Sequence, residues 1–464
     1  AGRANLAGQF FEGRSRPAGV KIAKFTPQGI LLVAGLIIQL YMLFRLNFAS
    51  RLPAGRANLA GNGNLPPSAK SSFTPDIPRK LRPPPTFANN ANRIATSPKM
   101  TSPVIRTGPL SFPAKTMDPF LFLVYHKDQY PAGNDKMEAP KRGNGADFNP
   151  SAPYRMYHGD RIPGFPQHPH RGAPPPLARL LPLAGGRGGA LLITTPCLPP
   201  AGFETITATL DGIIDHSDSL GCAGRYGQGD LQWMTAGRGI VHGENFPLIN
   251  KDKPNPTKFF QIWLNLPSKD KMAKPDFVMH WAPDISKIEL PGGAGRVIVW
   301  AGELEGAKGL PPPTASWAKK PENDVALYHI ALQPGGTFTV PGAKGGATTN
   351  RAAYFLEGAS LDVGGKKLSE HCMATLDAQK EAVFTNAGSD EVELLVMQGK
   401  PIGEPVAQHG PFVMNTQDEI RQAFADYQRT QFGGWPWDDD AVVFPADKGR
   451  FSLLYGKEDT PSDQ

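Results

Sequence analysis

Cysteine is scarce in this chain of 464 residues, and so are long apolar runs. Cys197, Cys222 and Cys372 are an odd number without any Cys-x-x-Cys spacing. This argues against a disulfide framework or a zinc-thiolate site and indicates free thiols in a reducing compartment. The apolar run at 29–44, GILLVAGLIIQLYMLF, has sixteen residues. Because a membrane-spanning helix needs about twenty and a signal-peptide core about 7 to 15, both a signal anchor and a cleaved leader remain open.

Acidic residues are nearly absent from residues 1–116. This segment has sixteen lysines and arginines against only Glu12 and Asp76, a local charge of +14; since the whole chain carries +7, the remaining residues carry −7. No aromatic or groove-reading motif lies among these charges, which argues against nucleic-acid binding. The composition is typical of a targeting leader or a disordered arm.

Two regions also lack hydrophobic periodicity. The octapeptide AGRANLAG occurs at 1–8 and again at 54–61, but no other segment shares its period, so it is not a solenoid repeat. Residues 173–202 are rich in proline, glycine and leucine. We hypothesise that parts of the extension and the 173–202 segment are translated non-coding sequence or lineage-specific disordered insertions. The sequence of the mature transcript distinguishes these alternatives.

From Met117 onward the chain changes character. Short runs rich in Val, Ile, Thr, Phe and Tyr recur between turn-forming residues, for example KFFQIWLNL, RVIVWAG, VALYHIAL and VELLVMQG. Many short strands with turn signals between them predict an all-β sandwich or barrel. The run ASLDVGGKKL predicts a hairpin that turns at Gly364 and Gly365.

One helix is predicted near the carboxyl end. Thr416 and Glu419 form a capping box, Ile420 begins an apolar face, and Gly433 ends the helix. We expect four parts, in chain order: a largely disordered basic extension at 1–116, a first β-barrel at 117–285 that carries the insertion 173–202, a second barrel with the helix at 286–450, and a tail at 451–464.

Two pairs of polar side chains suggest a metal centre. His168 and His170 flank one residue, and so do His242 and Glu244. In an extended strand residues i and i+2 point to the same face, so two such pairs on neighbouring strands bring four donors together. Three neutral nitrogens and one carboxylate suit Fe(II), Mn, Ni or Cu and leave coordination positions open. The net positive charge of such a site favours an anionic oxygen ligand such as an enolate or a catecholate.

The sequence around these residues resembles the pirin family of the cupin superfamily. When residues 173–202 are skipped, HPHRG continues as FETI, and GDLQWMTAGRGIVHGE follows. MDPFLFLVYHKD resembles the amino-terminal strand region of the family, and QHGPFVMNTQDEI resembles its carboxy-terminal segment. The resemblance extends from Met117 to about Gly433 and implies a bicupin, with two cupin-type barrels.

The resemblance also implies the site and its chemistry. By this resemblance, the first barrel binds one metal ion, which is usually iron in the family, and the ligands are His168, His170, His242 and Glu244. The second barrel lacks His-x-His and is expected to be free of metal; lone histidines such as His216 are interpreted as structural. The activity implied is that of a quercetin 2,3-dioxygenase, in which a deprotonated flavonol reacts with dioxygen and carbon monoxide leaves. Glu244 is then both a ligand and the acceptor of the substrate proton, and we expect the insertion to form a flap over an intact site.

Two alternatives to the enzyme remain. Pirins are also iron-dependent, redox-sensing co-regulators of transcription, which implies a transcription-factor partner; the body's charge of −7 argues against direct DNA contact and allows a basic protein partner. The second alternative to the enzyme is a bicupin without metal that serves for storage or as a scaffold. We expect a monomer in the cytoplasm or nucleus, as in the family, or an organelle-targeted or membrane-anchored protein if the leader at 29–44 functions as one.

Overall fold

The computed structural model describes residues 101–143, 147–170, 179–182, 190–193 and 202–463. The apolar run at 29–44 and both octapeptide copies lie outside these residues, as does most of the predicted insertion. Within the described part of the chain, no helix has both the length and the apolar character needed to cross a membrane.

The strands arise from alternating side chains. In β11 (Asn255–Asn265), Phe259 and Trp263 point to one face, and Phe260 and Ile262 point to the other. Both faces are buried, because Phe259 joins an aromatic cluster inside the first barrel whereas Phe260 and Ile262 join a cluster shared by the two barrels. A strand that is covered on both faces shows a nearly continuous apolar run, as KFFQIWLNL does.

The first barrel consists of two antiparallel sheets. One sheet has six strands in the order β28 (Lys457–Asp459), β27 (Phe451–Leu454), β8 (Ala223–Gly227), β7 (Ile213–Asp218), β10 (Ile240–Asn245) and β3 (Gly164–His170). The other has five, in the order β12 (Asp276–His280), β9 (Leu231–Thr235), β6 (Phe203–Asp211), β11 and β2 (Phe120–Tyr130).

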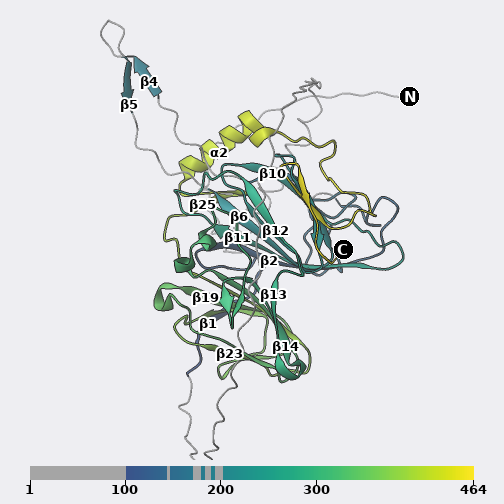
Figure 1. Cartoon of the computed structure of the whole chain (residues 1–464), viewed down its shortest axis with the longest axis vertical. Helices are drawn as coiled ribbons and strands as arrows, with labels where there is room; N and C mark the ends of the chain where they lie inside the picture. The colour runs from purple at the N-terminus through teal and green to yellow at the C-terminus, as the bar shows by residue number, and fades with distance from the viewer. Residues whose placement is uncertain (1–100, 144–146, 171–178, 183–189, 194–201, 464) are drawn as a thin grey trace, which may run out of the picture. The chain divides into compact units, whose positions relative to one another are not determined.

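The second barrel repeats this arrangement. Its larger sheet has seven strands in the order β1 (Val104–Pro109), β22 (Cys372–Leu376), β19 (Asn350–Glu357), β24 (Val392–Gly399), β17 (Ala326–Leu332), β14 (Gly295–Ala301) and β13 (Ser286–Glu289). Its smaller sheet has four, in the order β18 (Thr337–Val340), β23 (Ala382–Asn386), β20 (Leu361–Val363) and β21 (Lys366–Leu368). Figure 1 shows β19, β1, β23 and β14 together, in a different group of strands from β6, β10 and β11.

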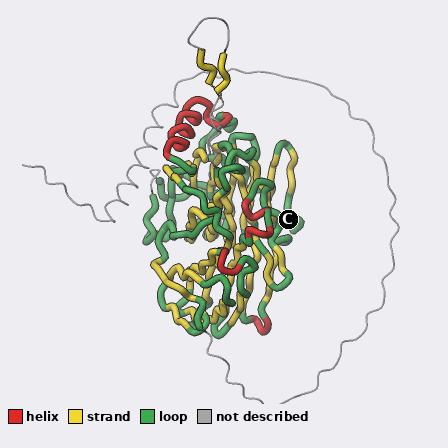
Figure 2. Tube along the Cα trace, turned by 90° about the vertical axis from the view of Figure 1, so that its left-hand side faces the viewer, coloured by secondary structure: helices red, strands yellow, loops and turns green. Residues whose placement is uncertain are grey.

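The remaining elements are short. Three two-stranded ladders pair β4 (Arg179–Pro182) with β5 (Ala190–Ile193), β15 (Glu303–Leu304) with β16 (Ala307–Lys308), and β25 (Ala407–His409) with β26 (Phe412–Met414). Five 3-10 turns lie at Pro291–Gly293, Trp317–Lys319, Pro321–Asn323, Gly346–Thr348 and Gln431–Gly433. Figure 2 shows strands joined by many loops, and α2 (Gln417–Thr430) is the one long helix of the described chain.

The predicted all-β fold with two barrels and a carboxy-terminal helix is confirmed. The helix α2 has the predicted capping box, in which the Thr416 hydroxyl accepts from the Glu419 amide and the Glu419 carboxylate accepts from the Thr416 amide. The hairpin turns at Gly364 and Gly365, whose φ angles of +55° and +89° suit glycine.

The ends of the described chain depart from the predicted division into parts. Strand β1, which lies in the predicted extension 1–116, pairs with β22 of the second barrel. Strand β27, which lies in the predicted tail, pairs with β8 of the first barrel. Helix α2, assigned to the second barrel, packs in one apolar cluster with Val241 of the first. Edge strands join through backbone hydrogen bonds, so side-chain patterns do not reveal which sheet they join.

Candidate metal centre

Strands β3 and β10 place the histidines on neighbouring strands of the first barrel. The two strands are antiparallel, with His242 opposite His168 and Ile240 opposite His170. His168 and His170 are separated by one residue, so both side chains lie on the same face of β3. The strand spacing of about 4.8 Å then brings the imidazole of His242 beside that pair.

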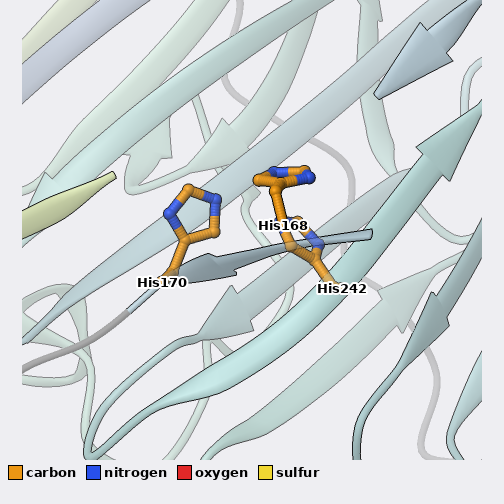
Figure 3. A group of neighbouring side chains, drawn as sticks. All are labelled: His168, His170 and His242. Carbon is orange, nitrogen blue, oxygen red and sulfur yellow. The ribbon is translucent and has the colours of Figure 1, made fainter. Parts of the chain in front are cut away.

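The three imidazoles gather at one point (Figure 3). One ring nitrogen from each of His168, His170 and His242 lies within 4.8 Å of the others. Their ring centroids are 4.4 Å apart for His168 and His242, 4.8 Å for His170 and His242, and 4.9 Å for His168 and His170. Nitrogens at this separation can all reach one cation at the bond length of about 2.0–2.1 Å known for imidazole and zinc, after small ring rotations.

Backbone carbonyls orient two of the rings. The Nδ1 atom of His168 lies 3.0 Å from the Pro166 carbonyl oxygen, and that of His170 lies 3.2 Å from the Pro411 carbonyl oxygen. A hydrogen bond of this kind places the proton on Nδ1 and leaves Nε2 as a lone-pair donor, which is the usual arrangement around protein-bound metals.

Burial keeps His170 and His242 neutral. Burial, with the neighbouring His168, lowers the pKa of both His170 and His242 well below the ordinary value. Neither ring nitrogen of the fully buried His242 has a hydrogen-bond partner among the described residues. A buried polar group without a partner is costly, and a divalent cation satisfies the requirement of neutral imidazole lone pairs.

Glu244 lies near the three histidines but outside their tight group. The β3–β10 register shifts between His242 and Glu244, because two steps along β10 face three along β3, from His168 to Phe165; the extra residue of this bulge therefore lies in β3. Glu244 Oε1 accepts from the Thr207 hydroxyl at 2.9 Å and the Tyr226 hydroxyl at 3.2 Å, and Oε2 accepts from Gln261 Nε2 at 2.8 Å. Burial raises the pKa of Glu244 above the ordinary value. The predicted role of Glu244 as fourth ligand stays a prediction.

His216 is a further histidine, fully buried, next to the group. Its ring centroid is 5.4 Å from that of His242, and it lies opposite Glu244 in the β7–β10 ladder. Its nearest carboxylate oxygen, Asp218 Oδ2, is 3.6 Å from Nε2, which is too long for a hydrogen bond. The sequence interpretation treated His216 as structural; its alternation with Ile214, which lies in the first barrel's aromatic cluster, is the signal that could have placed it inside.

Aromatic rings form a wall beside the histidines. His170 meets Phe203 edge-on at 5.2 Å and Trp263 at 5.3 Å between centroids, and Phe122 stacks on Trp263 at 4.6 Å. An apolar wall next to a few polar donors is typical of sites that bind small aromatic molecules.

Strand β3 ends at His170, and the next strand of the first barrel, β6, begins at Phe203, directly after Gly202. The three-histidine group is intact despite this excursion, of which β4 and β5 form an antiparallel hairpin. Buried Lys271 donates to the Gly202 carbonyl oxygen at 3.0 Å and to Asn265 Oδ1 at 2.6 Å. This anchor fixes the returning chain immediately before Phe203.

Comparisons with known proteins agree with this architecture. The family model described as Pirin matches residues 188–264, and the one described as Pirin C-terminal cupin domain matches residues 327–433. The chain is 31% identical to pirin of Homo sapiens over 291 residues, which cover 62% of this chain and 83% of the human protein. The chain belongs to the pirin family. The two matched regions fall in the two barrels, as a bicupin requires.

Two further proteins to which the chain is similar carry an enzyme's name. The chain is 36% identical, over 234 residues, to a Pseudomonas aeruginosa protein provisionally named quercetin 2,3-dioxygenase, covering 50% of this chain and 77% of that protein. A crystal structure of quercetin 2,3-dioxygenase from Acinetobacter baumannii has a TM-score of 0.50 and 26% identity, covering 68% of this chain and 86% of that one.

Proposed function

We propose that the first barrel holds one transition-metal ion on His168, His170, His242 and Glu244 and acts as a quercetin 2,3-dioxygenase. The observation that carries the proposal is the group of three imidazoles, two of them buried and that of His168 partly buried, whose nitrogens lie within 4.8 Å of one another beside an aromatic wall. The names of the Pseudomonas and Acinetobacter relatives support the choice of reaction. Iron is the metal that we favour, and Mn, Ni and Cu also suit these donors.

The bound metal would supply Lewis-acid and one-electron chemistry toward the flavonol and dioxygen. The residues of the chain do the rest. Trp263 offers a flat apolar surface against which a flavonol ring can lie, and the fully buried Phe203 packs on Trp263 and His170 and so keeps water from the histidines. The overall change is balanced, because a flavonol and dioxygen yield one ring-opened ester and carbon monoxide.

Glu244 is the candidate base. Its carboxylate is buried, and burial raises its pKa, so it accepts a proton more readily than an exposed carboxylate. Thr207, Tyr226 and Gln261 fix its orientation through the three hydrogen bonds given above. We propose that Glu244 takes the proton of the flavonol hydroxyl that reacts, because an anionic oxygen is the form that a cationic site favours.

Oxygen uptake with quercetin tests this function. Protein loaded with Fe(II) under argon is expected to consume dioxygen and release carbon monoxide in equal amounts, and Glu244→Gln is expected to lower kcat by about 10²–10⁴-fold. Glu289→Gln, on exposed β13 of the second barrel, is the matched control and should react as the unaltered protein does. Metal content is measured on each sample. Iron-loaded protein without turnover contradicts the proposal and favours the regulatory alternative.

A further inference from the structure

A cavity away from the three histidines is lined mainly by residues of the second barrel and its loops, together with Trp233 of the first barrel. Its volume is 310 Å³, within the range of small-molecule sites. The positive side chains that line it outnumber the negative ones by four to two: Lys308, Lys320, Lys344 and Arg351 against Glu303 and Asp324. The cavity is therefore electropositive.

Arg351 projects from β19 into the interior of the second barrel. Residues 351, 353 and 355 alternate on one face of the strand, and Ala353 and Phe355 belong to the barrel's apolar core. Only 2% of Arg351 is exposed. Gln398, directly opposite in the β19–β24 ladder, points into the same interior.

The partners of Arg351 are all neutral. Its Nε and Nη2 atoms both donate to Gln398 Oε1, the former at 2.7 Å, and Nη1 donates to the Lys380 carbonyl oxygen at 3.3 Å. Gln398 Nε2 in turn donates to the Asp324 carbonyl oxygen at 3.2 Å, which keeps the oxygen of Gln398 turned toward the guanidinium. A guanidinium has five N–H donors. One donor on each terminal nitrogen is thus unused among the described residues.

The other buried arginines of the described chain have carboxylate partners. Arg225 forms a two-pronged ion pair with Asp215, at 2.7 Å for each hydrogen bond, and Arg155 pairs with Asp128. Within the described residues no carboxylate lies within 4.0 Å of the Arg351 guanidinium nitrogens. The nearest candidate in the cavity, Asp324, uses Oδ2 to accept from the Gly345 amide at 2.9 Å and the Thr349 hydroxyl at 3.2 Å.

A buried charge without a counter-charge is expensive, so natural proteins pair such groups or bind an ion to them. The two unused donors lie on the two terminal nitrogens, which together form one planar edge of the guanidinium. That edge matches the two oxygens of a carboxylate in spacing and in plane.

We propose that the cavity of the second barrel binds a small organic carboxylate, whose two oxygens accept from the terminal nitrogens of Arg351. The exposed Lys308 and Lys344, now paired with Glu303, lie at the entrance and attract an anion to it. Val340, Pro341 and Leu310 line the remaining wall and face the hydrocarbon part of the ligand. The anion supplies a counter-charge in direct contact with the guanidinium, whereas Asp324 interacts with it only from a distance. This site is separate from the three-histidine group and does not depend on the proposed function.

Isothermal titration with acetate, succinate, benzoate and inorganic phosphate tests the proposal on the full chain. The samples are metal-free, so that anions do not bind at the histidines. We expect saturable binding of at least one carboxylate, weakened by about tenfold or more in Arg351→Gln, because charge-assisted hydrogen bonds to the anion are lost. Arg296→Gln, at an exposed position of β14 in the same sheet, should bind as the unaltered protein does.

A second variant covers the case in which Arg351→Gln does not fold. Gln398→Glu places a carboxylate opposite the guanidinium, so it should raise the melting temperature and abolish the binding of the added carboxylate. Absence of carboxylate binding to the unaltered protein overturns the proposal, and so does equal binding by Gln398→Glu. Phosphate bound more tightly than every carboxylate overturns the assigned ligand class.

Discussion

Glu204 gives the clearest prediction about stability. It lies fully buried on β6, where Oε1 accepts from the Thr235 hydroxyl at 2.8 Å and Oε2 from the Ser316 hydroxyl at 2.5 Å. Burial raises the pKa of Glu204 from 4.5 to about 7. Since Ser316 belongs to a loop next to the second barrel, this carboxyl group also links the two barrels.

The raised pKa fixes the direction of the pH dependence. Between pH 4.5 and 7 the native protein keeps the Glu204 proton while the unfolded chain loses it. The contribution to stability is therefore fully present below pH 4.5 and is lost as the pH rises toward 7. At about 1.4 kcal/mol for each unit of pKa difference, the loss is on the order of 3 kcal/mol.

Glu204→Gln removes this titration and keeps the shape of the side chain. We expect the free energy of unfolding of the variant to match that of the unaltered protein near pH 4.5 and to exceed it by up to about 3 kcal/mol at pH 7 and above. Urea unfolding of metal-free protein at intervals of half a pH unit measures the difference, with Glu289→Gln as the exposed control. Parallel stability profiles for Glu204→Gln and the unaltered protein would refute the reasoning.

Three further substitutions have defined outcomes. Asp215→Ala leaves the guanidinium of Arg225 buried without its ion pair and should cost about 3–5 kcal/mol in urea unfolding. Adding Arg225→Met should recover only part of this loss, because Arg225 also donates to three backbone carbonyl oxygens. Burial lowers the pKa of Lys271 to about 7, so stability should rise between pH 7 and 10.5, and Lys271→Met should abolish that rise in thermal melts. Gly164→Ala should destabilise by about 1–3 kcal/mol in the same melts, because its φ is +130° and the new Cβ would lie 2.5 Å from the Glu244 carbonyl oxygen; an unchanged melting temperature would contradict this.

Local sequence patterns were enough to predict the fold class and the three-histidine group. The alternation of side chains gave the strands, and the spacing of His168, His170 and His242 placed the imidazoles on shared faces of two strands. Both the alternation and the histidine spacing are set by residues that are close together in the sequence. The bulge of β3 between Phe165 and His168, opposite Glu244 and His242, was not predicted, although Pro166 lies within it and proline in a sheet is typical of edges and bulges.

Long-range pairings account for the other differences. Strand β1 pairs with β22, more than 260 residues later in the sequence. Arg225 of the first barrel donates a hydrogen bond to the carbonyl oxygen of Phe444 at 2.8 Å. Neither contact has a periodic signature. The electropositive cavity was equally hidden, because a single Arg351 in the run TTNRAAYF gives no sign that its neighbours across the sheet are neutral.

The metal content of the purified chain tests the central claim most directly. After loading with Fe(II) and removal of free ions, elemental analysis of the unaltered protein should find about one iron per chain, and of His242→Gln about one tenth of that or less. The His280→Gln variant, whose histidine lies outside the group on β12, should retain the full amount. Unaltered protein without stoichiometric metal, or His242→Gln with a full equivalent, would contradict the account.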